Sequence, residues 1–313
     1  MLYLLLAGVF CYFYYKKVIF PYTGESVSSL NAVASFDTYK PFQFRLLLPM
    51  MFMVLKSLGI VAGKKFILAY SFLIVYAVIV VQFRLISEYL ENTKAALLLA
   101  PVILYPMAWN YILINNIFMY YDLSAILLFS LGLYFILKDN FRMLLLVFLT
   151  GLLNKETIAY LAIAYALFNY RILFTKKIII NIAIFAVVFI VFKFILNYIF
   201  AGNPGDTVEI TFLTNMWILE DLFTNHIYTK DVFLNFGAMY VIAILLFVTG
   251  RWKRFPDRRK VYMNLTFFIY LLMGVTIVYF TEVRVFSELM PLVSLLFIIY
   301  ISTFEKLNLK PRS

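Results

Sequence analysis

Long apolar runs recur along the whole chain, and they constrain the fold more than any other feature. A run of about 15–22 residues suits a helix that crosses the ~30 Å hydrocarbon core of a bilayer. Hydrophobic residues make up 65% of the 313 residues and charged residues 14%, with a mean hydropathy of +0.93. This composition excludes a water-soluble fold and predicts an all-α, polytopic membrane helix bundle that forms one domain over residues 1–313.

About ten membrane helices are expected. The apolar pattern places them near residues 2–20, 66–88, 95–114, 122–138, 143–153, 157–170, 178–200, 237–250, 261–281 and 286–303. The first is predicted to be retained rather than cleaved as a signal peptide, because no basic region precedes it.

Two further helices are expected to lie on the outer face without crossing the membrane. Residues 45–62 contain Pro49 and Lys56, which favour a partly buried interfacial helix within the outer loop 21–65. Counting this segment as a full span would instead invert every later loop, unless the N-terminus also lay on the outer side. The outer loop 201–236 holds an amphipathic stretch near Phe212 and Trp217 that suits the membrane interface.

The basic residues predict the orientation, because cytoplasmic loops are rich in Lys and Arg. One side holds 16 of the 27 basic residues and only 5 of the 16 acids. The basic residues of this side are Arg84, Lys94, Lys138, Arg142, Arg171, Lys176, Lys177, six in 251–260, Lys306, Lys310 and Arg312. We expect this side and both termini to be cytoplasmic. The net charge of +11 then reflects membrane topology, and no nucleic-acid partner is expected.

Several function classes are excluded. Cys11 is the only cysteine and His226 the only histidine, so disulfides and clustered Cys or His metal sites are ruled out. The predicted cytoplasmic loops are short and contain no Gly-rich phosphate loop. An enzyme of this kind would meet its substrates on the outer side and use a lipid-borne donor. No cofactor is expected, and a divalent metal requirement is left open.

Acidic residues at the ends of apolar segments are the candidate functional residues. An ionisable group at membrane depth costs roughly 2.5–3.5 kcal/mol on insertion scales, which makes each one a functional hypothesis. The clearest cases are Asp37, Asp122, Glu156 and the cluster Glu282, Arg284 and Glu288. Their expected location on one face indicates a charged, membrane-borne substrate.

Two of these positions also have structural interpretations. Asp122 opens a predicted helix, where it suits a helix N-cap as well as a catalytic role. Asn154-Lys155-Glu156-Thr157 lies between two runs too short to span, which predicts a turn within the membrane. Its Lys155 and Glu156 are expected either to pair with each other or to order a binding cavity, with Lys155 contacting a phosphate.

The cations have alternatives as well. Arg45 is expected either to extend to the membrane surface or to clamp a phosphate with its guanidinium fork. Arg284 and Glu288 are four residues apart, so a structural salt bridge on one helix face is an alternative to substrate binding. Lys193, inside an apolar run, has no sequence explanation.

Four segments resemble a family of bacterial polytopic membrane proteins whose layout is similar to the glycosyltransferase C superfamily. They are Pro41-Phe42-Gln43-Phe44-Arg45-Leu46-Leu47-Leu48-Pro49, Tyr121-Asp122-Leu123, Leu153-Asn154-Lys155-Glu156-Thr157, and Glu282-Val283-Arg284-Val285-Phe286-Ser287-Glu288-Leu289-Met290-Pro291. The superfamily includes protein O-mannosyltransferases and aminoarabinose transferases. The tight Asp-Glu pair often found after the first helix of better-known members is missing, which leaves the base open among Asp37, Glu25 and Asp122.

The resemblance implies a membrane glycosyltransferase of the bacterial inner membrane with an outward-facing active site. Its donor would be a polyprenyl phosphate-linked sugar, and its acceptor a glycan, lipid or protein. Asp37 and Asp122 are the catalytic candidates. The phosphate- or substrate-binding candidates are Gln43, Arg45, Lys155, Glu156, Arg284 and Glu288.

Two other functions stay open at this point. One is a polysaccharide polymerase or ligase that uses polyprenyl pyrophosphate-linked glycans. The other is a transporter or flippase for a charged lipid or sugar, for which paired interrupted helices are typical. Only one interruption, at residues 154–157, is visible in this sequence.

Overall fold

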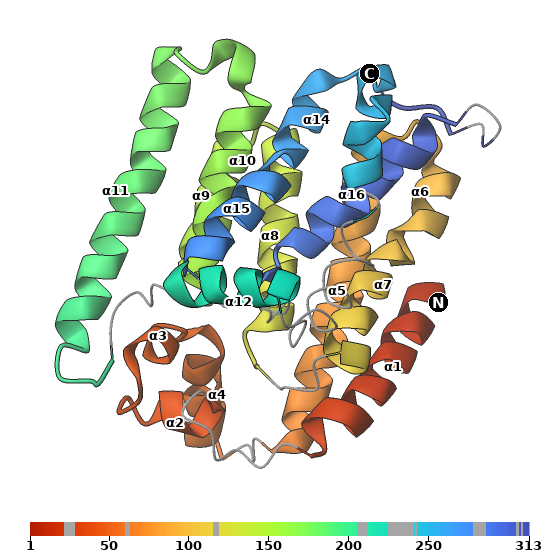
Figure 1. The fold of residues 1–313 in the computed structure, drawn as a ribbon. Coiled ribbons are helices and arrows are strands. Elements are labelled where there is room, and N and C mark those ends of the chain that lie inside the picture. The colour runs from red at the N-terminus through yellow and green to blue at the C-terminus, as the bar shows by residue number, and fades with distance from the viewer. Residues whose placement is uncertain are drawn as a thin grey trace.

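The structure is a computed structural model that describes residues 1–21, 29–59, 63–114, 119–205, 212–224, 241, 243–277, 286–304, 307 and 309–312. Within these residues it is all-helical, and the only β-type pairing is an isolated bridge between Leu90 and Pro311. The long helices run side by side (Figure 1). Helix α12 lies across them at mid-height, and the short helices α2, α3 and α4 lie together at the lower end.

The helices follow the predicted order closely. Those of the first half are α1 (Leu2–Tyr14, extended by a π-helical turn Tyr15–Ile19), α2 (Leu30–Ala34), α3 (Lys40–Gln43), α4 (Leu47–Ser57), α5 (Lys64–Tyr89), α6 (Thr93–Leu99), α7 (Leu104–Ala108, followed by a π-helical segment Trp109–Ile114), α8 (Asp122–Leu137) and α9 (Phe141–Leu152). Those of the second half are α10 (Tyr160–Phe168, preceded by a 3₁₀ turn Glu156–Ala159), α11 (Lys176–Ile199), α12 (Phe212–Thr224), α14 (Arg258–Asn264), α15 (Thr266–Ile277) and α16 (Leu289–Ser302).

Four helical segments in the described part of the chain are long and apolar enough to cross a membrane. They are Leu2–Ile19, Lys64–Tyr89, Thr93–Leu113 and Lys176–Ile199. The other apolar helices are shorter, among them Asp122–Leu137, Phe141–Leu152 and Glu156–Phe168. The all-helical architecture is therefore confirmed, whereas the expected count of about ten spans is not. Of the predicted helix at 237–250, the structure describes residues 241 and 243–250, and residues 243–248 are helical.

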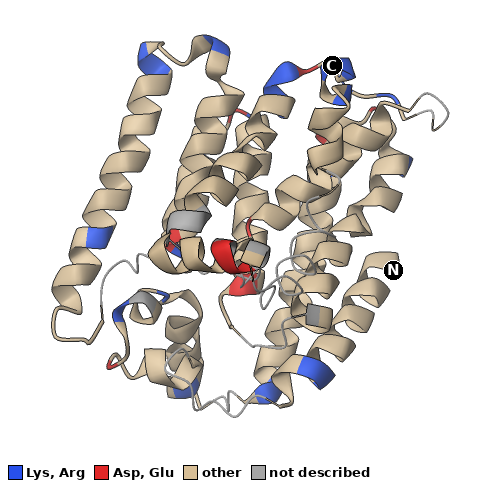
Figure 2. Ribbon diagram, in the orientation of Figure 1, with Lys and Arg blue, Asp and Glu red and all other residues tan. Residues whose placement is uncertain are grey.

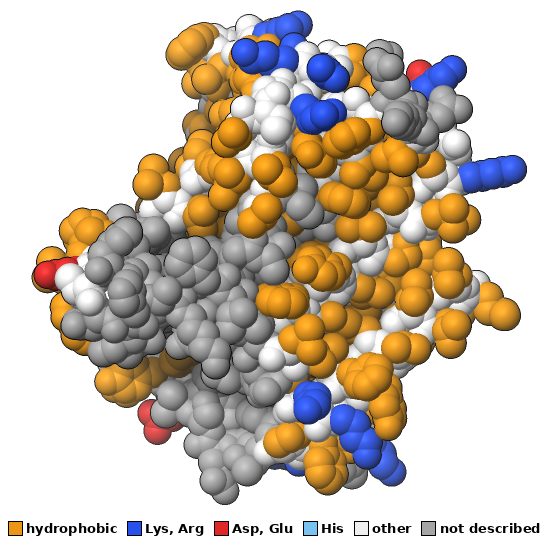
Figure 3. Space-filling view, turned by 45° about the vertical axis from the view of Figure 1, so that its right-hand side comes forward, with side chains coloured by type: hydrophobic (Ala, Val, Ile, Leu, Met, Phe, Trp, Pro, Cys, Tyr) orange, Lys and Arg blue, Asp and Glu red, His pale blue; other side chains and the backbone are white. Residues whose placement is uncertain are grey.

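The surface fits a membrane location. On α11, Val187, Ile190, Phe194 and Tyr198 are all more than half exposed, and their spacing places them on one helix face. Among the described residues in Figure 3, apolar side chains cover most of the surface between basic side chains at its two ends. Exposed apolar side chains of this extent are typical of a lipid-facing surface.

Helix α8 lies at the centre of the bundle and is apolar on all sides. It packs against α5, α9, α10 and α16, which explains why residues from Asp122 to Ile136 are buried around its whole circumference. A Cβ at Gly132 would overlap the side chain of Leu161 on α10. This glycine lets the two helices approach closely, as small residues do in membrane bundles.

The turn between α9 and α10 lies inside the molecule. The C-terminal end of α9 and the N-terminal end of α10 both lie near the height of α12, well short of the lower end of α11 (Figure 1). Asn154 and Lys155 in the turn between them are 1% and 4% exposed. The turn is therefore covered by protein, which is the condition for irregular backbone at membrane depth.

One end of the bundle gathers segments that were all predicted to be cytoplasmic. Lys138, after α8, pairs with Glu88 of α5 at 2.7 Å, and the backbone N–H of Arg312 donates to the Tyr89 carbonyl at 2.8 Å. Lys260 of α14 donates to the Arg312 carbonyl at 3.0 Å. Figure 2 shows Lys and Arg gathered at this end, where the C-terminus lies.

Helices also form in both segments that were predicted to lie at the membrane interface. Helix α4 falls within the predicted segment 45–62. In α12 the polar Asn215 and Asp221 are buried, whereas Leu213 and Trp217 are exposed. Because its apolar face points outward, α12 suits contact with lipid rather than water.

Candidate functional site

Hydrogen bonds join the start of α8 to the α9–α10 turn. The side-chain amide of Asn154 donates to the Tyr121 carbonyl at 2.9 Å, and its oxygen accepts from the Ser124 hydroxyl at 2.8 Å. Asn154 is buried, so these bonds satisfy its side chain where water does not reach. They place Asp122 beside the residues that follow Asn154.

The segment around Arg45 is attached to the same junction. The backbone N–H of Leu47 donates to the Leu153 carbonyl at 2.8 Å, and the Tyr120 hydroxyl donates to the Arg45 carbonyl at 3.1 Å. Three of the four predicted motifs are therefore joined by hydrogen bonds at one place. This place lies between the central helices and the α2–α4 cluster.

Arg45 points into this junction rather than toward the surface. Its guanidinium carbon lies 4.1 Å from the centre of the Tyr121 ring and 5.0 Å from that of Phe42. In the described part of the chain, its buried Nε and Nη1 atoms have no hydrogen-bond partner. Glu156 and Asp122 are the carboxylates that act on its charge. Arg45 is half-buried, and its Nε and Nη1 atoms are covered by this junction.

Asp122 is the first residue of α8 and is 1% exposed. The N-cap position belongs to Tyr121, so the N-cap interpretation of Asp122 is wrong by one residue. Its carboxylate still lies at the positive end of the helix dipole, which stabilises a negative charge there.

Lys155 and Glu288 form a buried ion pair. Lys155 Nζ lies 3.3 Å from Glu288 Oε2, and the two side chains are 4% and 1% exposed. Glu288 also accepts hydrogen bonds from the hydroxyls of Thr157, Tyr270 and Ser287. This ion pair joins the α9–α10 turn to the start of α16. Lys155 therefore pairs with a distant carboxylate rather than with its neighbour Glu156.

Three cations act on Glu156, and the sequence did not explain one of them. The charges that act on it are Arg45 first, then Lys193 and Lys155. Lys193, on α11, lies with its Nζ 4.8 Å from the centre of the Phe44 ring. A lysine inside an apolar run suggests an acidic residue nearby, but nothing in the spacing identifies Glu156 as an acid within its electrostatic range.

Tyr111 is a second residue that sequence reasoning missed. It is 1% exposed and lies in the π-helical segment Trp109–Ile114, within electrostatic range of both Asp122 and Glu288. Single π-helical turns occur often at functional sites because they redirect a side chain. The apolar pattern of residues 95–114 gives no sign of this local change.

Two predicted site residues lie elsewhere. Gln43 is buried and its amide serves the fold, because it donates to the Val33 carbonyl at 3.0 Å and accepts from the Thr38 N–H at 3.3 Å. Asp37 is exposed between α2 and α3. In the described part of the chain, no contact joins Asp37 to Asp122.

Three candidates, Glu25, Glu282 and Arg284, lie outside the described residues. Among the described residues, no group of three or more His, Cys, Asp or Glu side chains is placed to hold a metal ion. The junction thus brings together Arg45, Asp122 and Glu156, with Lys193 nearby. The Lys155–Glu288 pair joins the same turn to the start of α16.

Comparison with known proteins gives no relative: no family model, no curated protein and no solved structure matches this chain.

Proposed function

We propose that this chain is an integral membrane glycosyltransferase that moves a sugar from a polyprenyl phosphate carrier to an acceptor on the outer face of a bacterial inner membrane. The observation that carries the proposal is the half-buried Arg45, whose buried Nε and Nη1 atoms lie within electrostatic range of the carboxylates of Glu156 and Asp122. A bound phosphate would satisfy the Arg45 nitrogens that the described protein groups leave without a hydrogen bond.

The proposed reaction needs one base and a cationic partner for the leaving group. The acceptor hydroxyl loses its proton to the Asp122 carboxylate, and its oxygen forms a bond to the anomeric carbon. The bond from that carbon to the phosphate oxygen breaks, and Arg45 stabilises the charge on the departing polyprenyl phosphate. In-line displacement of this kind inverts the anomeric centre.

The surroundings favour Asp122 over Asp37 as the base. Asp122 is buried beside Arg45, whereas Asp37 is exposed and has no described contact with this junction. Lys193 is proposed as a second cation that acts through Glu156. Lys155 and Glu288 are proposed to position the α9–α10 turn, because they neutralise each other.

Turnover in detergent tests the proposal, because a transferase needs no second compartment. The purified protein is incubated with a panel of polyprenyl phosphate sugars and candidate acceptors. The amide of Asp122→Asn keeps the size of the side chain but is not basic. Turnover should therefore fall by about 10²–10⁴-fold while donor binding stays. Arg45→Lys should weaken donor binding, because lysine keeps the charge and loses the guanidinium fork.

Asp139→Asn is the matched control. Asp139 is exposed at the opposite end of α8 and has φ +48°, a backbone conformation that asparagine also tolerates. Its turnover should equal that of the wild type. Full activity of Asp122→Asn would remove Asp122 as the base. Donor binding without turnover, together with movement of the lipid across vesicle membranes, would favour a transporter.

A further inference from the structure

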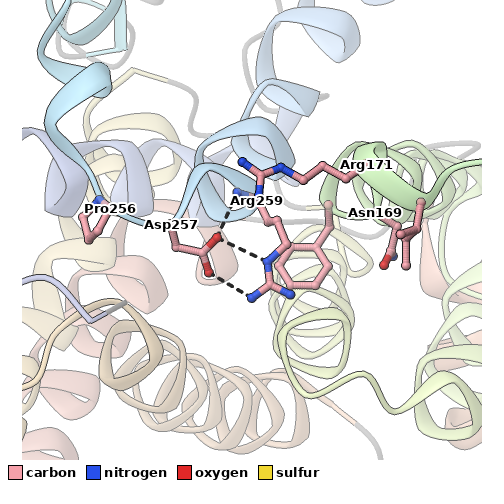
Figure 4. A pocket seen from close by; sticks show the side chains of 7 residues that line it. Asn169, Arg171, Pro256, Asp257 and Arg259 are labelled. Carbon is pink, nitrogen blue, oxygen red and sulfur yellow. Dashed lines mark hydrogen bonds and ion pairs between the residues drawn. The ribbon is translucent and has the colours of Figure 1, made fainter.

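A pocket of about 500 Å³ lies at the end of the bundle opposite the junction of Arg45 and Asp122. It opens between the end of α10 and the start of α14, and Figure 4 shows its lining. The lining residues are Phe168, Asn169, Arg171, Ile172, Pro256, Asp257 and Arg259. The whole of α10 separates it from the α9–α10 turn, so the two sites are distinct.

Positive charge exceeds negative charge in this pocket. Asp257 is the one acid of the lining, and its carboxylate is already shared. It accepts the Arg259 N–H at 3.0 Å, pairs with Arg259 Nη2 at 3.3 Å and lies 3.5 Å from Lys260 Nζ. Burial by itself would raise the pKa of Asp257, but the hydrogen bonds and charges of Arg259 and Lys260 hold it below its ordinary value. Asp257 therefore stays ionised and neutralises these cations only in part.

Arg171 adds a charge that no carboxylate in the described part of the chain neutralises. Its Nε donates to the Tyr170 hydroxyl at 2.8 Å, which orients the guanidinium. In Figure 4 the side chains of Arg171 and Arg259 extend over the same pocket, one from the end of α10 and one from α14. Two guanidinium groups on facing elements suit an oxyanion that accepts several hydrogen bonds, of which phosphate is the common biological case.

The remaining wall is apolar. Phe168, Ile172 and Pro256 line it, and the guanidinium of Arg259 lies 5.1 Å from the centre of the Phe168 ring. Close by in the chain, Phe174 is 88% exposed, as expected of a side chain in contact with lipid. The pocket is thus cationic on one side, apolar on the other, and located at the end of the bundle where the C-terminus lies, among other basic residues (Figure 2).

We propose that this pocket binds the phosphate of an anionic phospholipid headgroup, with Arg171 and Arg259 on the phosphate and Phe168 and Ile172 beside the glycerol and first acyl carbons. Basic pockets between membrane helices on the cytoplasmic side are suited to such headgroups. A soluble phosphate shares the same chemistry with the arginines. The apolar wall beside exposed apolar residues favours the lipid.

Native mass spectrometry of the purified full-length protein in detergent tests this proposal. Dioleoyl phosphatidylglycerol is the probe, and dioleoyl phosphatidylcholine carries the same phosphate with a compensating positive charge. The wild type should retain phosphatidylglycerol in preference to phosphatidylcholine. Arg171→Gln should weaken its binding about tenfold, because a charge-assisted phosphate contact is lost. Arg171→Lys should bind phosphatidylglycerol more weakly than the wild type and more tightly than Arg171→Gln, because lysine keeps the charge but lacks the guanidinium fork.

Arg142→Gln is the matched control, since Arg142 is an exposed arginine at the same end of the bundle and outside the pocket. It should bind phosphatidylglycerol as the wild type does. Equal losses in Arg171→Gln and Arg142→Gln would show diffuse attraction and overturn the site. Equal retention of phosphatidylcholine would overturn the preference for an anionic lipid. Glycerol 1-phosphate or inorganic phosphate that binds as tightly and displaces the lipid would assign the pocket to a soluble anion. Circular dichroism and size-exclusion profiles confirm that each variant is folded.

Discussion

At the scale of single residues, Lys155 and Glu288 form a buried ion pair that joins distant parts of the described structure. The two residues are 133 positions apart, and both are almost inaccessible to solvent. Taking two charges out of water is costly, and their attraction offsets that cost only while both are present. The pair therefore links α9, α10 and α16 in a way that neither residue achieves alone.

Removing one partner should cost more than removing both. Lys155→Met leaves the Glu288 carboxylate buried without its cation, and we expect a loss of about 3–5 kcal/mol in the free energy of unfolding. The double variant Lys155→Met with Glu288→Gln should recover more than half of that loss. Unfolding by SDS in mixed micelles, followed by circular dichroism, measures both.

The exposed pair of Lys177 and Asp139, at 3.2 Å, supplies the control. Its double-mutant cycle should give a coupling of about 0.2–1 kcal/mol, because solvent screens exposed charges. If the losses from Lys155→Met and Glu288→Gln simply add in the double variant, the two residues are not coupled and the ion pair contributes nothing to stability.

The sequence singled out a set of charges but did not indicate how they pair. Arg45, Asp122, Lys155, Glu156 and Glu288 stood out because ionisable groups at the ends of apolar segments are costly. The pairing depends on how distant helices pack, and no spacing along the chain carries that information. Gln43 was also predicted to bind substrate. Its side-chain amide instead forms hydrogen bonds with backbone groups five and ten residues away.

At the scale of secondary-structure elements, the packing of α8 on α10 depends on a missing side chain. A methyl group at Gly132 would overlap Leu161, so Gly132→Ala forces the two helices apart or shifts that leucine. We expect a loss of about 1–3 kcal/mol in stability, the usual cost of overpacking. Thermal unfolding of the purified protein in detergent measures it.

Gly8→Ala is the matched control, because the nearest atom to a Cβ there is Phe72 Cε2 at 3.9 Å, an ordinary contact. Helix propensity alone favours alanine over glycine by about 1 kcal/mol, so Gly8→Ala should be neutral or stabilising. Opposite signs for the two changes would identify packing as the cause. Equal effects would mean that α8 and α10 are not held closely at Gly132.

Apolar patterns located the helices well but not their lengths or breaks. An apolar run has the same pattern whether its helix spans a membrane or ends inside a bundle, so the ten predicted segments include several short helices. The segment 261–281 also divides at Leu265 into α14 and α15. Just before the break, the Asn264 amide donates to the Tyr89 hydroxyl at 2.8 Å and to the Lys260 carbonyl at 2.7 Å. These bonds depend on tertiary contacts, which local sequence does not reveal.

At the scale of the whole molecule, the two ends of the bundle are chemically different. One end joins the C-terminus to α5, α8 and α14 through ion pairs and backbone bonds. At the other end, the Asn203 amide donates to the carbonyls of Phe36 and Thr38 at 3.1 and 2.9 Å and holds the α2–α3 turn. The proposed functions of both sites depend on which end faces the cytoplasm.

Cysteine labelling in intact cells tests this orientation. Cys11 is buried in α1, and Cys11→Ala gives a background without cysteine. Gly202→Cys suits the end near α2 and α3, because a Cβ there meets no atom within 4 Å. Gly205 is unsuitable, since its φ is +88° and a Cβ would overlap Tyr39. Arg254→Cys probes the opposite end, where Arg251 donates to Thr303 at 3.4 Å.

A membrane-impermeant maleimide should modify Gly202→Cys in intact cells and Arg254→Cys only after permeabilisation. The reason is that Arg254 belongs to the segments that hold 16 of the 27 basic residues, a bias that cytoplasmic surfaces favour. The reverse pattern would place Arg45 and Asp122 toward the cytoplasm, where nucleotide sugars are available, and a lipid-linked donor would no longer be required. It would also move the pocket of Arg171 and Arg259 to the outer leaflet. This single measurement therefore decides which donor and which lipid the two sites can meet.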